Sequence, residues 1–88
     1  MNASQLRERV TKSLLDEIEE AQFPSVTMMN RLEGTLVDPD ALGQYAEILV
    51  EKVQATRFPS ISMLNRVDAV LARLEQAERV QANGARSD

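Results

Sequence analysis

The chain has 88 residues, of which 10 are basic and 14 acidic, so its formal charge is -4. A chain of this length forms one small domain, which leaves apolar surface for a second chain to cover. It contains no cysteine and no histidine, which removes disulfides, thiolate chemistry and the commonest general base and zinc ligand, and the acidic balance disfavours nucleic acid and anionic lipid as partners.

The first predicted helix covers about residues 4–22, and its apolar residues recur at spacings of three and four, as in an amphipathic helix. They are Leu6, Val10, Leu14, Leu15, Ile18 and Ala21. Phe23-Pro24 ends this helix, because proline lacks an amide hydrogen and disfavours helical backbone at the residue before it. Ser25 can then cap the next helix with its hydroxyl.

The second predicted helix covers about residues 25–35 and places its large apolar residues on one face. They are Met28, Met29, Leu32 and Leu36. Gly34 is expected to help the chain leave this helix. For the third helix, Asp38 is a suitable N-cap, Pro39 suits the first helical position, and Asp40 places negative charge where the helix dipole favours it.

The third predicted helix ends near about residue 57, and one of its apolar residues does not fit the main apolar face. That face consists of Leu42, Tyr45, Ala46, Leu49, Val50 and Val53. Ile48 lies away from it, and the corresponding residue in the first half of the chain is Ser13. Two alternatives follow: the helix contacts other structure on two sides, or Ile48 is a single exposed isoleucine.

The fourth predicted helix begins after Phe58-Pro59 with Ser60 as its cap and continues to about residue 81. Its apolar face is the most regular in the chain and consists of Met63, Leu64, Val67, Val70, Leu71, Leu74 and Ala77. Because this helix outlasts the second by several turns, we place the expected dimer contact along the third and fourth helices. Residues 83–88 are predicted to be a flexible polar tail.

An internal repeat relates the two halves of the chain. Residues 23–33 match residues 58–68 at a shift of 35 positions, with every aligned pair identical or chemically close. We interpret the match as a duplication, with units at residues 4–36 and 39–81 inside one helical domain of residues 1–82. Two copies are too few for a solenoid. The pattern therefore predicts an all-α fold of two tandem helix-turn-helix hairpins in a four-helix bundle, completed by homodimerisation, and it fits closure within one chain as well as closure between chains.

The repeated Phe-Pro-Ser corners give a measurable expectation. We expect Phe23 and Phe58 to be buried, so that replacing either by alanine costs about 3 to 5 kcal/mol. If the rings are exposed instead, the corners become the best candidate contact site.

Candidate partner-binding residues come from polar pairs that are present in both units. Asn30-Arg31 and Asn65-Arg66 lie outside the apolar faces. Either each arginine reaches an acidic residue of a neighbouring helix, such as Asp16 or Glu51, and fixes the register, or the pairs form an edge that binds a partner. The methionines either fill the core or belong to an adaptable contact surface. The candidate residues are Asn30, Arg31, Asn65, Arg66, Ile48, Met28 and Met63.

No combination of residues predicts catalysis. The carboxylates at positions 16, 17, 19 and 20 have no histidine companion and no calcium-binding loop, so we expect a solvated acidic face, no metal and no cofactor. Ser25 and Ser60 are interpreted as caps and not as nucleophiles. The isolated glycines lack a phosphate-binding spacing.

The sequence therefore predicts a non-catalytic protein interaction or oligomerisation module, such as an adaptor or regulatory subunit. The first residues lack the apolar run of a secretory signal, and no stretch of about 18 apolar residues occurs, so we expect a cytoplasmic protein without membrane contact. The alternative is a helix-turn-helix DNA-binding regulator, because residues 60–66 carry Ser, Asn and Arg at a helix start after a short turn. Glu33, Asp68 and the lack of a basic cluster count against it.

Overall fold

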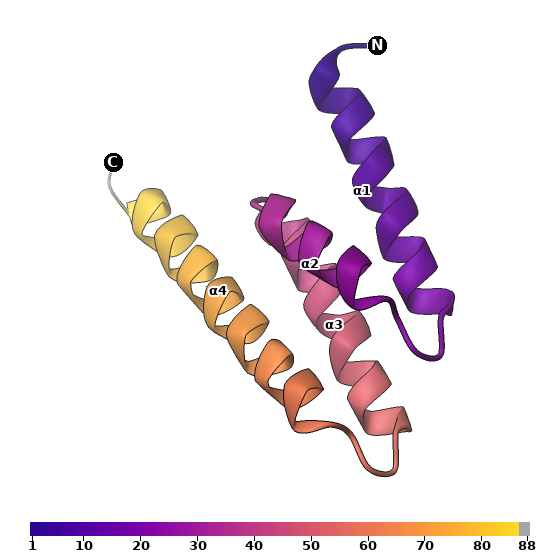
Figure 1. Cartoon of the computed structure of the whole chain (residues 1–88). Helices are drawn as coiled ribbons and strands as arrows, with labels where there is room; N and C mark the ends of the chain where they lie inside the picture. The colour runs from indigo at the N-terminus through magenta and orange to yellow at the C-terminus, as the bar shows by residue number, and fades with distance from the viewer. Residues whose placement is uncertain (87–88) are drawn as a thin grey trace. The chain divides into compact units, whose positions relative to one another are not determined.

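The structure, a computed structural model, describes residues 1–86, with side chains described for residues 1–81. Residues 1–86 form four α-helices and no strand: α1 (Ala3–Glu20), α2 (Val26–Thr35), α3 (Pro39–Ala55) and α4 (Ile61–Arg86) (Figure 1). The all-α prediction is confirmed. Helix α4 continues to Arg86, past its predicted end near residue 81. The flexible tail at 83–88 stays a prediction, and residues 87 and 88 lie outside the described part.

The helices pack as two pairs that belong to two compact units. The first unit spans Met1–Leu36 and holds α1 against α2, and the second begins at Val37 and holds α3 against α4 (Figure 1). Each pair is joined by a short corner that contains a Phe-Pro-Ser triplet. No helix within residues 1–86 is both long enough and apolar enough to cross a membrane.

In the first unit, α1 starts with a capping box. The Gln5 amide donates to Asn2 Oδ1 at 2.9 Å and the Asn2 amide donates to Gln5 Oε1 at 3.1 Å, which satisfies two amides that the helix leaves free. The buried apolar side chains of this unit are Leu15, Ile18, Met29, Leu32 and Leu36.

The predicted apolar stripe of α1 is only partly buried. Leu6 and Val10 belong to the predicted stripe and are 48% and 57% exposed, so this part of the stripe is not covered within the chain. The ten residues of α2 span about 15 Å and the 18 of α1 about 27 Å, so α2 covers only part of α1. Residues four apart also drift by about 40° around a helix, which turns Leu6 away from the face that carries Ile18.

In the second unit, α3 has a capping residue at its start and charged residues at both ends that suit the helix dipole. Asp38 accepts from the Asp40 amide at 3.4 Å, Pro39 occupies the first turn, and Lys52 lies in the last turn. The buried apolar side chains are Leu42, Tyr45, Ala46, Ile48, Leu49 and Val70. Because Ile48 is only 8% exposed, the alternative of a single exposed isoleucine is wrong.

Candidate functional site

The first corner, residues 21–25, joins α1 to α2 through extended backbone. Ala21 has φ -75° and ψ 129°, and its amide donates to the Glu17 carbonyl at 3.1 Å, which closes the last turn of α1. Ser25 is also extended, and its hydroxyl accepts from the Met28 amide at 3.4 Å. Its carbonyl accepts from the Met29 amide at 3.0 Å and begins the regular bonding of α2.

The second corner, residues 56–60, also joins two helices through extended backbone and a serine cap, but it closes the preceding helix with a tighter last turn. Thr56 has φ -98° and ψ 124°, its amide donates to the Val53 carbonyl at 3.2 Å, and its hydroxyl donates to the Lys52 carbonyl at 2.7 Å. Ser60 Oγ then accepts from the Met63 amide at 3.0 Å. The predicted capping roles of Ser25 and Ser60 are confirmed.

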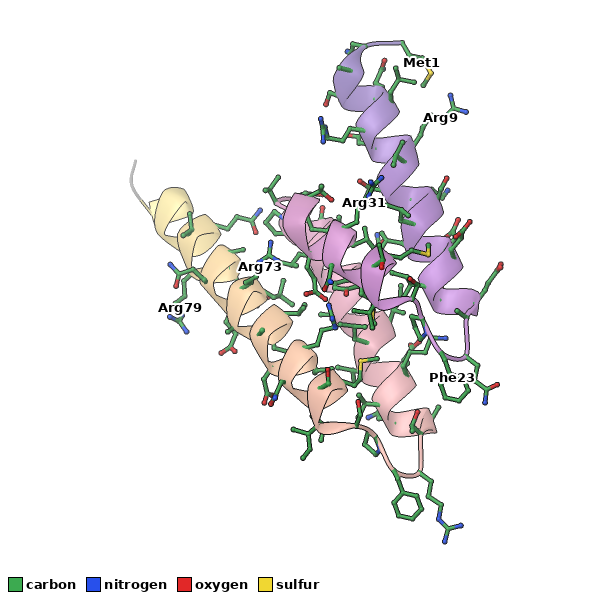
Figure 2. All side chains as sticks on the ribbon, viewed as in Figure 1. Met1, Arg9, Phe23, Arg31, Arg73 and Arg79 are labelled. Carbon is green, nitrogen blue, oxygen red and sulfur yellow. The ribbon has the colours of Figure 1, made fainter. Side chains whose placement is uncertain are left out.

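The two phenylalanine rings of the chain lie at these corners and are open to solvent. Phe23 is 80% exposed and Phe58 is 82% exposed, and Figure 2 shows the Phe23 ring at the α1–α2 connection. The expectation that both rings are buried is therefore wrong. Proline disfavours helical backbone at the residue before it, so each ring leaves the apolar face of the preceding helix without joining the next one. This effect of proline was the one local signal in the sequence that could have predicted the exposure.

Other side chains extend the apolar surface at both corners. Val26 is exposed in the first turn of α2, and Ile61 and Leu64 are exposed in the first turns of α4. At the second corner, the Arg57 guanidinium carbon lies 5.4 Å from the centroid of the Phe58 ring, a distance at which a cation is attracted to the ring face. These exposed apolar residues lie within six sequence positions of the rings, and we call Phe23 with Val26, and Phe58 with Ile61 and Leu64, the aromatic corners.

The corners offer apolar surface for contact with another protein. A flat apolar ring beside aliphatic side chains can enter an apolar pocket of another protein, and aromatic residues are enriched in the energetically important part of protein interfaces. The only hydroxyls of the Phe-Pro-Ser triplets cap helices. Within residues 1–81 no group of three or more acidic residues is arranged to hold a metal ion.

The structure gives the predicted partner-binding residues different exposures. Asn30, Arg31 and Asn65 are exposed, Arg66 is partly buried, and so are Met28 and Met63. Ile48 is buried, so it offers little surface to a partner. The pairing of the arginines with acidic residues of a neighbouring helix stays a prediction.

Comparisons of the chain with models of known protein families, with curated proteins and with solved structures give no match. The function is therefore inferred from the residues of the chain itself.

Proposed function

We propose that the protein is a non-catalytic interaction or oligomerisation module, an adaptor or regulatory subunit, that binds a protein partner through its aromatic corners. The observation that carries the proposal is the exposure of Phe23 and Phe58, at 80% and 82%. Both rings follow a helix that ends one turn earlier and precede a serine-capped helix, so they occupy equivalent places in the two hairpins.

Energetics support a role in binding. Covering a large apolar side chain completely contributes about 1.5 to 3 kcal/mol, and at both corners most of this contribution has not been used in folding. Two corners in one chain can also act together, because binding at one raises the effective concentration at the other. We further propose that the two hairpins are copies of one ancestral unit, since the residues that end, cap and expose each corner are the same or closely similar.

A photo-crosslinking experiment tests the proposal. Phe23 and Phe58 are replaced, one at a time, by benzoylphenylalanine in the full chain and irradiated in the cells that make the protein. We expect both positions to form adducts with the same protein, which is then identified by mass spectrometry. If the module acts by oligomerisation, the protein captured at both positions is a second copy of the chain.

The control position is Gln76, which is exposed on α4 and lies away from both corners in sequence. Adducts at Gln76 with the same yield and the same proteins would show that capture reflects exposure alone. That result, or the absence of adducts at both corners, contradicts the proposal.

A further inference from the structure

A row of exposed residues follows one face of α1 and contains no residue of the aromatic corners. Positions that alternate by three and four residues along this helix fall on one face, as in a helix that pairs with another helix. On α1 these positions are Ala3, Leu6, Val10, Ser13, Glu17 and Glu20, and all six are exposed. The buried residues Leu15 and Ile18 lie on a different face, so α1 packs within its unit and still presents this row.

The charges of α1 are divided between its two halves. Residues 3–12 contain three basic side chains, Arg7, Arg9 and Lys12, and one acidic side chain, Glu8. Residues 13–20 contain four acidic side chains and no basic one. The helix thus has a basic first half and an acidic second half.

This order opposes the dipole of the helix itself. A helix favours negative charge at its first turn and positive charge at its last turn, and α1 has neither. By contrast, α3 follows the rule, with Asp40 in its first turn and Lys52 in its last. The charge order of α1 therefore does not stabilise the isolated helix, and a partner that complements it accounts for the order better.

We propose that α1 pairs with α1 of a second copy of this chain in antiparallel orientation. Antiparallel alignment brings the basic half of each helix beside the acidic half of the other and also opposes the two helix dipoles. The contact is isologous, because the same surface serves both copies. When Val10 lies level with Ser13 of the second copy, Leu6 lies level with the methylene groups of Glu17.

Two flanking charges define the register. Arg9 and Asp16 are seven residues apart and so occupy the same side of the exposed row. In the antiparallel pair, Arg9 of each copy faces Asp16 of the other, which gives two equivalent ion pairs. The Arg9 side chain already lies along the start of α1, because its Nη1 donates to Met1 Sδ at 3.1 Å, and Figure 2 shows both residues at that end of the helix.

The observations favour a second copy over other occupants. An anionic membrane would attract the first half of α1 but repel the four carboxylates of the second half. An unrelated acidic helix would complement only the basic half. The second copy complements both halves with residues that the chain itself supplies. The pairing rests on the proposed function, because it names a second copy of the chain as one partner of an oligomerisation module. It uses the exposed row of α1, which contains no residue of the aromatic corners.

Sedimentation equilibrium of the full chain, from about 10 µM to 1 mM in low salt, tests the pairing. We expect a reversible monomer–dimer equilibrium. Arg9→Asp and Asp16→Arg should each weaken association about tenfold. Each change replaces both ion pairs of the dimer by a pair of like charges, two carboxylates in the first variant and two guanidinium groups in the second.

Mixing the two variants provides a charge-swap control. Association should return, because the aspartate introduced at position 9 of one variant then faces the arginine introduced at position 16 of the other, while the unchanged Arg9 and Asp16 face each other. The Arg9→Asp/Asp16→Arg double variant should associate like the original chain for the same reason.

Arg79→Asp makes the same change of charge on exposed α4 and is expected to leave association unchanged. Circular dichroism checks that every variant remains helical. The proposal is overturned if the original chain stays monomeric to 1 mM, if the single variants associate normally, or if their mixture does not regain association. Corner adducts that persist in monomeric Arg9→Asp protein would then leave the proposed function standing, whereas a charge-dependent dimer without corner adducts would overturn the proposed binding through the aromatic corners and leave the pairing of α1 standing.

Discussion

Replacing Phe58 by alanine tests whether this ring contributes to the stability of the fold. An exposed ring should contribute little to the free energy of unfolding and so be free to bind a partner. Phe58 is 82% exposed, so about one fifth of a side chain that can bury about 200 Å² is covered, or about 40 Å². At about 25 cal/mol per Å², this burial contributes about 1 kcal/mol, and the exposed contact with Arg57 adds about 0.5 to 1 kcal/mol. Leu49 in the same unit is fully buried, and Leu49→Ala should cost about 2 to 5 kcal/mol.

Urea unfolding followed by circular dichroism measures both changes. The free energy of unfolding of an 88-residue chain is typically about 4 to 13 kcal/mol, so the two variants should differ clearly in their midpoints. Equal destabilisation by Phe58→Ala and Leu49→Ala would refute the reasoning, because it would mean that the ring is covered in solution. If the loss of unfolding free energy in Phe58→Ala grows with protein concentration, the Phe58 ring is buried by self-association.

Three further predictions concern helix stability and nucleic acid. Gly34 lies inside α2, and a Cβ built there meets no described atom within 4 Å, so Gly34→Ala should raise the free energy of unfolding by about 1 kcal/mol in the same assay. Ser60→Ala should lower it by about 1 kcal/mol, because the Met63 amide loses its acceptor, whereas Ser60→Asp should retain most of the stability. Random duplex DNA at low salt should not be retarded in a gel by the chain, whose charge is -4; a clear shift would revive the helix-turn-helix alternative.

The helices and their ends were predictable because the residues that set them act locally. Pro24 and Pro59 stop the preceding helices, and Ser25 and Ser60 cap the following ones through hydroxyl contacts with amides three residues ahead. These effects need no knowledge of the rest of the fold. No proline occurs near the C-terminal end of α4, and the helix continues through Asn83-Gly84, a pair typical of helix ends, so the sequence predicted too early an end.

Burial was less predictable, because it depends on how far the neighbouring helix reaches. Leu6 and Val10 fit an apolar stripe, but α2 is too short to cover them. Phe23 and Phe58 are large apolar residues next to helices, yet the extended backbone before proline turns both rings outward. Ile48 is the opposite case: its position off the main face suggested exposure as one alternative, and it is buried. Exposure, which defines the candidate site, is therefore the property that the sequence predicted least well.

The most direct test of the proposed contact site uses the fact that the chain has only two phenylalanines. Labelling with fluorophenylalanine gives two ¹⁹F resonances, one from each aromatic corner, and a soluble gadolinium chelate broadens the signal of any ring that water reaches. We predict strong broadening of both resonances in the purified chain and protection of both when the crosslinked partner is added. Rings that are shielded in the dilute purified chain, or that stay equally accessible in the presence of that partner, would contradict the claim that the corners are the binding surface.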